Sequence, residues 1–543
     1  MITREMAEVK LREMLANLPP RFVEMVRHIE FMGGKPQIVG GVIPRTLLGR
    51  PMKDVDVEVF GLEPDKLFTC LQERCADVRW QGKTFGVIVA ETADDEEYEV
   101  ALPRWERRIP GTTGPRDFEV GIAPDMSRYE AARRRDYTIN AMSIDPLTGE
   151  FFDLHGGLQD LNDGILRPVS ERFAEDPERV IKGARHAAEL GFRLTEEEGA
   201  RAMLRGISSQ HANILPERLQ KDWMKIFEAD RPGDALIFLR DAGWLENYPE
   251  FNNLIGLKQT PIWHGEEDAF IHTVLVANAA PQMVWRNALG KEEGMAVRIA
   301  ALLHDIGKHL TTEYSEKMGV WDWRSPGHAH VGAEMVPAAM ARMNAPARYI
   351  QAVVALTEMH MVHMDFGGRE VTRVHAERIA VSLGAASHRM LKALCDADHM
   401  GRGDKSELAQ TAQALFDAAV KWGVADKPPV YFITGDMIMP YYGGKGGKHV
   451  KTWKDRAYEA QIDGAFYTLE DGQKWLDRQI QKELRLLGGD FIVTLFGGKS
   501  GKHVQEVLDE LWQAQLKGEI LNEDQAKARA RQIVRRMSAV FTI

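Results

Sequence analysis

The spacing of hydrophobic and polar residues predicts a chain that starts with a helix, continues through a sheet and returns to helices. Over residues 1–35, apolar positions such as Leu11, Phe22 and Val26 recur at helical spacing, which predicts one amphipathic helix. Residues 36–166 contain short apolar runs separated by turns, which is typical of strands. The later pattern is helical. The predicted fold class is therefore α+β, with a small mixed β-sheet near the N-terminus followed by helical regions.

One predicted strand, Lys53–Phe60, carries Asp54 and Asp56 on one face and valines on the other, because side chains alternate along a strand. Two carboxylates this close repel each other, and one takes up a proton unless a cation lies between them. Magnesium prefers oxygen ligands and usually shares them with substrate phosphates. The pair therefore indicates a metal site, whereas an acidic edge strand is the alternative interpretation.

Two neighbouring segments complete a phosphoryl-transfer interpretation of the acidic strand. An apolar strand runs into Gly40 and Gly41, where the backbone can turn and offer N–H groups to a phosphate. Glu97 and Glu99 share one face of a later strand. Glu97 is expected at an exposed edge, and Glu99 is a candidate third metal-positioning carboxylate.

Basic residues in two places are suited to nucleotide contacts. The run that includes Arg134 and Arg135 ends at Asp136 and precedes an apolar strand, so its guanidinium groups are expected at a strand entrance, where they suit triphosphate or ribose contacts. Farther on, Asp176 and Arg179 are neighbours on a predicted helix start. They form either a salt bridge or a donor–acceptor pair that matches a base edge.

The composition, 44% hydrophobic and 27% charged over 543 residues, is typical of a globular protein of three or four domains. No apolar run approaches the roughly 20 residues of a membrane span, and the first residues lack the apolar core of a signal peptide. Three cysteines make no disulfide framework. A cytoplasmic protein without a membrane partner is expected. The net charge of −11 argues against non-specific coating of nucleic acid but leaves room for local basic patches.

A second candidate site lies in the middle of the chain, where eight of the seventeen histidines fall between His264 and His363. An apolar helix carries His304 and Asp305 side by side, and a lone histidine there would more often be a core residue. Further candidates are His272 on an earlier helix, His328 and His330 in a glycine-containing loop, His360 on a later helix and Asp398 on another. Imidazole with carboxylate suits Mn, Fe, Co, Ni or Zn rather than Ca.

The C-terminal region contains an internal duplication with an offset of 54 residues. Gly443–Val450 recurs as Gly497–Val504, and Ala460–Gly464 recurs as Ala514–Gly518. Each copy is expected to be a basic glycine-rich loop that opens a helix, followed by a second helix. The lysines are Lys445, Lys448, Lys499 and Lys502. Such loops are candidates for contact with an RNA backbone, and plain structural packing is the alternative.

Five motifs in one order closely resemble those of the tRNA nucleotidyltransferase (CCA-adding enzyme) and bacterial poly(A) polymerase family, over roughly residues 36–245. They are Val39-Gly40-Gly41, Asp54-x-Asp56, Arg134-Arg135-Asp136 with Tyr137–Met142, Gly156-Gly157-x-x-Asp160-Leu161, and Glu175-Asp176-x-x-Arg179. His304-Asp305 with His272 and Asp398 resembles the HD phosphohydrolase superfamily, and Trp263-His264-x3-Asp268-x3-His272 also matches the multifunctional bacterial type.

The resemblance implies four domains: a nucleotidyltransferase head over 1–165, a helical neck over 166–250, an HD domain over 251–425 and a duplicated tail over 426–543. It implies that Asp54 and Asp56 hold Mg²⁺, with Glu99 as the third carboxylate. The implied nucleotide-binding residues are Gly40, Gly41, Arg45, Arg134, Arg135, Asp136, Asp176, Arg179 and Lys182. The implied HD ligands are His272, His304, Asp305 and Asp398, with His328 and His360 available for a second ion.

Two positions depart from the family pattern. Pro44-Arg45 stands where the family usually has Arg-Asp, which puts the role of Arg45 in doubt, and Lys182 stands where an arginine is usual.

The resemblance implies template-independent addition of CCA to the 3′ end of tRNA from CTP and ATP. It also implies phosphatase or 2′,3′-cyclic phosphodiesterase activity in the HD domain. Three alternatives stay open: a poly(A) polymerase or partial CCA-adding enzyme, an HD phosphohydrolase with an inactive head, and a non-catalytic RNA-binding protein. The sequence predicts no oligomeric state.

Overall fold

A computed structural model describes residues 1–52, 54–82, 86–109, 118–260, 265, 268–317, 319–402 and 406–540. The chain forms two compact units, Met1–Gly368 with Leu383–Gln413, and Arg369–Ser382 with Ala414–Ile543. Across these described ranges, no helix has the length and apolar character to cross a membrane. The four domain boundaries stay predictions. The acidic strand's Lys53, and Thr84 and Phe85 of another expected strand, lie outside the described residues.

The N-terminal segment is two helices, α1 (Arg4–Ala16) and α2 (Pro20–Phe31), rather than the single helix predicted. Pro19 and Pro20 explain the correction, because a residue before proline avoids helical torsion angles and proline favours the first turn of a new helix. The apolar face of α2 is buried, as the sequence pattern predicted.

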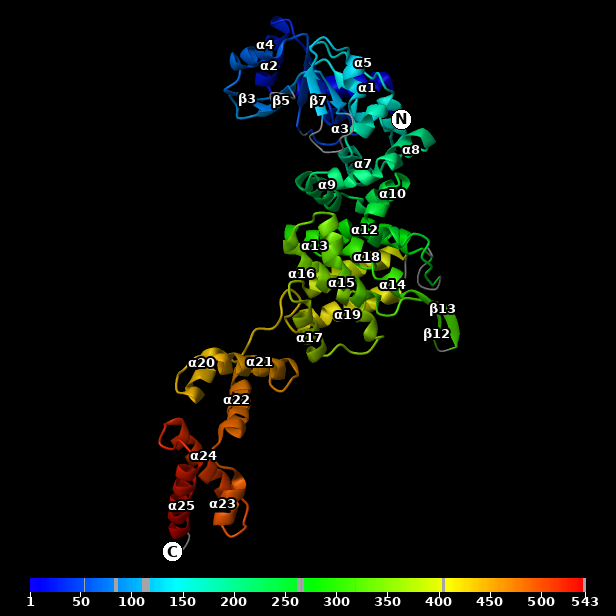
Figure 1. Cartoon of the computed structure of the whole chain (residues 1–543). Coiled ribbons are helices and arrows are strands. Elements are labelled where there is room, and N and C mark those ends of the chain that lie inside the picture. The colour runs from blue at the N-terminus through cyan, green and yellow to red at the C-terminus, as the bar shows by residue number, and fades with distance from the viewer. Residues whose placement is uncertain are drawn as a thin grey trace. The chain divides into compact units, whose positions relative to one another are not determined.

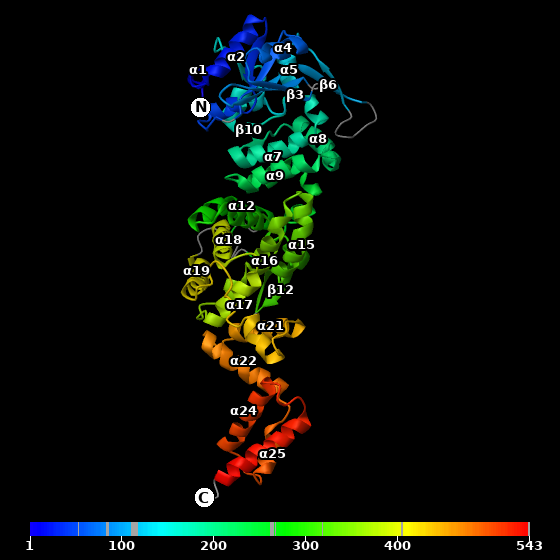
Figure 2. The ribbon, with the colours of Figure 1, turned by 90° about the vertical axis from the view of Figure 1, so that its left-hand side faces the viewer.

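The predicted mixed sheet is confirmed as seven strands in the order β3-β4-β5-β2-β1-β8-β9. β2 runs parallel to β5, and the other neighbouring strands are antiparallel. The strands are β1 (Lys35–Val39), β2 (Asp56–Phe60), β3 (Asp77–Gly82), β4 (Val87–Glu91), β5 (Glu97–Ala101), β8 (Ser143–Ile144) and β9 (Phe151–Phe152). Helix α2 packs against β1 and against α4 (Pro64–Gln72), which packs on β3, and both views show these helices over the sheet (Figures 1 and 2).

Shorter elements complete the head. Helix α3 (Val42–Leu47) follows β1 directly, and β6 (Arg104–Arg108) pairs with β7 (Phe118–Ile122) in a separate two-stranded sheet. The arginine run lies at the end of α5 (Arg128–Arg133). The apolar segment after it is a 3₁₀ turn, Thr138–Asn140, and not the predicted strand. Asp136 causes this difference, because its carboxylate accepts hydrogen bonds from the Tyr137 N–H and the Asn140 side chain and thereby closes a local turn.

Helix α6 (Gly157–Asp163) ends the head. The neck is mainly helical, as predicted, and contains α7 (Glu178–Leu190), α8 (Glu198–Gly206), α9 (Pro216–Glu228) and α10 (Pro232–Asp241). A short parallel pair, β10 (Ile165–Leu166) and β11 (Arg193–Leu194), interrupts the helices. Pro177 caps α7, in agreement with the predicted helix start.

The histidine-rich region is also mainly helical. It contains α11 (Pro249–Asn252), α12 (Ala269–Arg286), α13 (Lys291–Leu303), α14 (Lys308–Thr311), α15 (His328–Arg342), α16 (Ile350–Met359) and α18 (His388–Gly401). One element interrupts the expected helical pattern: the antiparallel hairpin of β12 (Glu313–Lys317) and β13 (Val320–Arg324).

The second compact unit contains nearly all of α17 (Arg373–Leu383) and the C-terminal part of α19 (Ser406–Lys421). The duplicated sequence then folds twice into the same motif. Its helices are α20 (Gly435–Ile438), α21 (Lys448–Ile462) and α22 (Leu469–Leu484), and then α23 (Gly489–Leu495), α24 (Lys502–Leu516) and α25 (Glu523–Val540).

Equivalent positions of the two copies are buried or hydrogen-bonded in the same way. Ile438 and Ile492 are buried in their respective cores. Gln461 donates to the Val430 carbonyl just as Gln515 donates to the Leu484 carbonyl, 54 residues later.

Candidate metal centres

Three carboxylates of the head, those of Asp54, Asp56 and Glu99, interact electrostatically. Asp56 is the first residue of β2, opposite Val39, whereas Asp54 precedes the regular strand and is exposed. Burial and the negative charges of Glu99 and Asp54 raise the pKa of Asp56 to about 6, against the opposing effect of Arg135. A shift of this kind requires the like charges to be close. Their oxygens are the hard donors that Mg²⁺ prefers. The described groups whose ligand atoms already lie close enough together to hold one ion are in the histidine-rich region, not here.

Gly40 lets the backbone turn beside this cluster. Its φ is +79°, and a Cβ there would lie 3.1 Å from Asp56 Oδ2. A larger residue would be strained and would also crowd the carboxylate. Gly41 follows as the N-cap of α3. The predicted glycine turn is therefore next to the predicted metal ligands.

The two glutamates of β5 are both exposed but have different neighbours. Glu97 lies at the start of the strand, opposite Glu91, and forms an ion pair with Arg79. Glu99 is the one that acts on the pKa of Asp56.

Glu58 was missed in the sequence. It is buried on β2, and its carboxylate pairs with both Arg134 (2.6 Å) and Arg135 (3.0 Å). Burial alone would raise its pKa, but the two guanidinium groups outweigh burial and lower it to about 2. Its position in the sequence, two residues after Asp56 on an apolar strand, could have revealed it, because a charged side chain on a buried strand needs partners of opposite charge. Glu58 thus anchors the two arginines beside the carboxylate cluster.

Asp136 of the head is held in its ionised form near α7 of the neck. Burial acts to raise its pKa, but His186, Asn140 and Lys182 together lower it. Lys182 also forms an ion pair with Glu178 at 3.4 Å.

The residues proposed to select the base are fixed by the backbone. Arg179 donates to the carbonyl oxygens of Arg172 and Arg134, both at 2.7 Å. Asp176 Oδ1 accepts from the Glu178 N–H at 3.0 Å. No ion pair joins Asp176 to Arg179 in the described part of the chain. Arg45 turns to the Pro51 carbonyl, which its Nε contacts at 3.2 Å.

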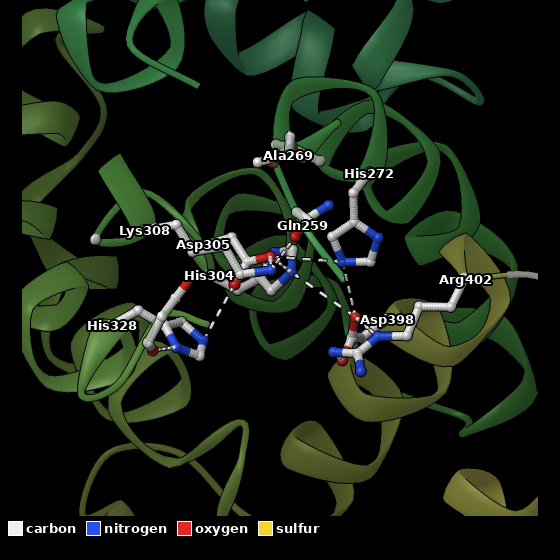
Figure 3. A network of polar contacts seen from close by, with 12 residues as sticks. Gln259, Ala269, His272, His304, Asp305, Lys308, His328, Asp398 and Arg402 are labelled. Atoms are coloured by element: carbon white, nitrogen blue, oxygen red, sulfur yellow. Dashed lines mark hydrogen bonds and ion pairs between the residues drawn. The ribbon is translucent and has the colours of Figure 1, made fainter. Parts of the chain in front are cut away.

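The second centre is built around Asp305 (Figure 3). Its Oδ2 lies 3.2 Å from His304 Nε2, 3.5 Å from His272 Nε2 and 2.6 Å from Lys308 Nζ. The other oxygen, Oδ1, lies 3.3 Å from His328 Nε2. All five side chains are buried. One carboxylate therefore faces two groups of imidazoles, and His360 belongs to the second group at 3.8 Å from Oδ1.

The imidazoles of His304, His328 and His360 are oriented in the same way. In each, Nδ1 contacts the carbonyl oxygen of the residue three positions earlier, at 2.9, 2.8 and 2.7 Å. Nε2 is then directed to the cluster, as in metal-ligating histidines whose other nitrogen is hydrogen-bonded. Burial and the neighbouring imidazoles keep the pKa of His360 well below its usual range, so its ring is neutral, as a ligand must be.

Asp398 lies between His272 and Arg402 (Figure 3). Its Oδ1 is 2.9 Å from His272 Nε2, and Arg402 donates to both carboxylate oxygens, at 2.9 and 2.6 Å. Although burial opposes ionisation, Arg402 and His272 keep the pKa of Asp398 well below its ordinary value. This buried set of imidazoles and carboxylates fits a divalent transition metal.

Two histidines of this region, His328 and His330, lie in a different element from the one predicted. His328 and His330 lie in the first turn of α15 rather than in a loop, because Gly327 caps the helix just before them. His330 is exposed and faces Glu334 and Glu358, away from the cluster. Trp263 and His264 lie outside the described residues.

The four lysines of the duplicated loops are all exposed. None forms an ion pair with a described carboxylate. His449 and His503 fold back on the loops in the same way, with Nε2 near the carbonyl oxygens of Lys445 and Lys499.

These centres define a nucleotidyltransferase head joined to an HD domain, two domain types that depend on metal ions. Family models agree: a poly A polymerase head domain matches residues 37–167, and an HD domain matches residues 269–400. The multifunctional CCA protein of Vibrio cholerae serotype O1 is 30% identical over 442 residues, which cover 78% of this chain and 98% of that protein. The chain belongs to the family of multifunctional CCA proteins, and the predicted resemblance is confirmed.

Other relatives and solved structures are consistent with this. A multifunctional CCA protein of Nitrosococcus oceani is 33% identical over 371 residues, covering 67% of this chain and 84% of that protein. The fold is similar to that of the Bacillus stearothermophilus CCA-adding enzyme in complex with CTP, with a TM-score of 0.55, 19% identity and coverage of 86% and 99%. It is also similar to that of the Thermotoga maritima CCA-adding enzyme complexed with tRNA, with a TM-score of 0.53, 14% identity and coverage of 87% and 98%.

Proposed function

We propose that the protein adds CCA to the 3′ end of tRNA from CTP and ATP, without a nucleic-acid template, in the cytoplasm. The observation that carries the proposal is the electrostatic coupling of Asp54 and Glu99 to Asp56, which lies beside the turn at Gly40. The printed names of relatives and structural neighbours, which include CCA proteins and enzymes bound to CTP and tRNA, support the same assignment.

In this proposal the residues of the head position a nucleoside triphosphate against an RNA end. Asp54 and Asp56 hold Mg²⁺, and Glu99 positions them. Magnesium, when bound, makes the 3′-hydroxyl more acidic and neutralises charge on the triphosphate. Gly40 and Gly41 offer backbone N–H groups to the phosphates. Such reactions depend on positioning and charge stabilisation, with little covalent chemistry from the protein.

The arginines and the start of α7 contact the nucleotide. Arg134 and Arg135 use their remaining donors on ribose and phosphates while Glu58 holds them in place. Asp176 and Arg179 select the base by presenting an acceptor beside donors, which imitates a Watson–Crick edge. The backbone contacts of Arg179 support this role. Both terminal nitrogens of its guanidinium group donate to backbone carbonyls, so the group and its remaining donors keep one orientation.

Asp136 and Lys182 lie close to this set and complete the predicted nucleotide-binding residues. Arg45 has the least support, because its side chain contacts the Pro51 carbonyl.

The HD centre is proposed to hydrolyse phosphomonoesters or 2′,3′-cyclic phosphodiesters. His272, His304, Asp305 and Asp398 hold one divalent metal (Mn, Ni, Co, Fe or Zn), and His328 and His360 are available with Asp305 for a second. A bound metal of this kind supplies the Lewis acidity that activates water. Lys308 and Arg402 keep Asp305 and Asp398 ionised and oriented toward the cluster.

The duplicated tail is proposed to contact the tRNA backbone through Lys445, Lys448, Lys499 and Lys502. Their exposure and the absence of ion pairs among the described residues leave their charges available to phosphates.

The first experiment incubates purified protein with a tRNA transcript that lacks its 3′ end and with labelled CTP, ATP or both. Incorporation that stops after two C residues and one A supports CCA addition. Long A tracts on any RNA would favour a poly(A) polymerase, and single-nucleotide addition would favour a partial enzyme. No incorporation with either nucleotide, while phosphohydrolase activity persists, would leave the HD centre as the main activity.

A further inference from the structure

The hairpin of β12 and β13 carries a row of exposed aromatic side chains. Tyr314 is opposite Trp323 in the ladder, and Trp321 is two residues from Trp323, so all three share one face. Tyr314 is 55% exposed, Trp321 58% and Trp323 37%. The ring centroids of Tyr314 lie 5.8 Å from those of Trp321 and 5.3 Å from those of Trp323. In Figure 1 this hairpin extends away from the helices around it.

The inner end of this aromatic row reaches the second metal centre. A cavity of about 470 Å³ is lined by Trp323 on one side and by His328, Lys308 and Arg402 of the metal centre on the other. Tyr314 and Trp321 do not line the cavity, and most of the hairpin residues that do line it (Glu313, Ser315, Lys317 and Arg324) lie on the opposite face of the ladder from these two rings. Trp323 therefore belongs both to the aromatic row and to the wall of the cavity beside the metal cluster.

The charges of the cavity favour a phosphate. Four cations line it, against two carboxylates from the hairpin, Glu313 and Glu316. Lys308 and Arg402 already balance the metal-ligating carboxylates. Lys317 and Arg324 form no ion pair with a described acidic side chain, so they can contact a phosphodiester.

We propose that this aromatic face is a stacking platform for the last bases of a single-stranded RNA whose 3′-terminal phosphate enters the cavity. Exposed aromatic rings in a row, next to cations, bind single strands because every base offers a ring face for stacking. This inference rests on the proposed phosphohydrolase function of the HD centre and names its substrate class: RNA 3′ ends rather than free mononucleotides.

The chemical step is a hydrolysis in which atoms balance. For a 2′,3′-cyclic end, a water oxygen bonds to phosphorus, one ester P–O bond breaks, and a proton from water ends on the released ribose hydroxyl. No oxidant or other co-reactant is needed. The platform takes no part in this step and acts only by holding the bases that precede the reacting nucleotide.

The test compares Trp321→Leu with the wild-type enzyme supplied with Mn²⁺. One substrate is a single-stranded RNA of about eight nucleotides ending in a 2′,3′-cyclic phosphate, and the other is cyclic 2′,3′-CMP. KM for the RNA should rise at least about fivefold, with kcat unchanged, because one base–aromatic stack is lost. Hydrolysis of cyclic CMP should be unchanged, because Trp321 lies outside the cavity.

Two further variants make the result specific. Trp321→Phe keeps a ring for stacking and should retain most of the RNA affinity. Trp285→Leu removes a 79% exposed tryptophan from the end of α12 and should change neither substrate's KM. If Trp321→Leu altered both substrates equally, or neither, the platform would be refuted, and the aromatic face would only stabilise the hairpin or bind a protein partner.

A separate measurement distinguishes failure of this inference from failure of the proposed function. Fluorescence anisotropy of the labelled RNA with metal-free protein reports binding without hydrolysis. If neither substrate is hydrolysed with any metal, the HD assignment fails. Weaker RNA binding by Trp321→Leu would then still support the platform, and equal binding would overturn it.

Discussion

The two metal centres of this chain use carboxylates under opposite conditions. In the head, Asp54 is exposed and Asp56 is half-buried. The negative charges of Glu99 and Asp54 raise the pKa of Asp56, and the positive charge of Arg135 opposes them. In the HD centre, Asp305 and Asp398 are fully buried among imidazoles, a lysine and a guanidinium. The head site is therefore more open, and its neighbouring guanidinium, that of Arg135, is already paired with Glu58. The HD site is enclosed, and a lysine or an arginine already balances the charge of each of its two aspartates.

This difference appears in the ionisation of the ligands. The pKa of Asp56 is raised to about 6 by burial and by Glu99. The pKa of Asp305 is well below its usual value, because His304 and Lys308 outweigh the effect of burial. A compensated site is ready for a tightly held metal. A repulsive site binds its cation best when substrate phosphates share it, so the comparison predicts an exchangeable ion in the head and a resident ion in the HD centre.

The largest expected effect comes from removing a proposed metal ligand of the head, which should abolish one activity and leave the other unchanged. Asp56→Asn should reduce CTP incorporation into tRNA lacking its 3′ end by about 1000-fold or more, because the charge that holds magnesium is lost. Hydrolysis of cyclic CMP should be unchanged. Both rates are measured on the same preparation.

Glu97→Gln is the matched control for this variant. It removes a carboxylate from the same sheet, but one that pairs with Arg79 at the strand's edge. Nucleotide addition should stay within about twofold of wild type. Intact incorporation by Asp56→Asn would show that the catalytic site is elsewhere.

A change in the HD centre should remove phosphohydrolase activity and leave nucleotide addition intact. His304→Ala should reduce phosphohydrolase activity at least about 100-fold, because a direct ligand is removed. His330→Ala removes an exposed histidine from the first turn of α15 and should be close to wild type. Nucleotide addition should be normal in both variants. If His304→Ala lost both activities, the centres would not be independent.

The amount that could be predicted from the sequence differs between the two centres. Asp54-x-Asp56, the glycine turn and Glu99 follow from strand alternation and motif order, which are local. The order of the sheet strands, and hence the position of Glu99 relative to Asp56, depends on the parallel pairing of β2 with β5, which was not predicted. Glu58 was missed because alternation places it on the same face as the metal ligands while its function depends on partners 76 and 77 positions away.

The HD ligands could be predicted only as a set. Histidine clustering indicated a site, but the two-sided arrangement around Asp305 comes from α12, α13, α15 and α16 packing together. The hairpin of β12 and β13 was not predicted, because Tyr314, Trp321 and Trp323 bury no core and leave only a weak alternation. The division of the helix over 1–35 could have been predicted from Pro19-Pro20.

An intermediate effect is expected from Glu58→Gln. Without its charge, Arg134 and Arg135 lose their anchor, and KM for CTP should rise about tenfold, with a smaller change in kcat. The free energy of unfolding should fall by about 3 kcal/mol, because the variant breaks a buried ion pair. Asp77→Asn, in an exposed pair with Arg79, should change stability by less than about 1 kcal/mol.

The pH dependence of this stability difference has a definite sign. The pKa of Glu58 is lowered from 4.5 to about 2 in the folded protein, so the stabilisation is fully present above pH 4.5. It is lost as the pH falls toward 2. Urea unfolding should therefore show the gap between wild type and Glu58→Gln at neutral pH and its closure below pH 4.5. A gap that is constant with pH would contradict the ion-pair explanation.

The smallest expected effect concerns the proton that competes with magnesium in the head. Because the pKa of Asp56 is about 6, the apparent affinity for Mg²⁺ in nucleotide addition should be about fourfold weaker at pH 5.5 than at pH 7.5. Glu99→Gln removes the largest like charge acting on Asp56 and should move the midpoint of this dependence to lower pH, even where kcat falls. Glu97→Gln should leave the midpoint in place. A midpoint insensitive to Glu99→Gln would mean that the two carboxylates do not share one metal site, and the contrast between a repulsive head site and a compensated HD site would then rest on burial alone.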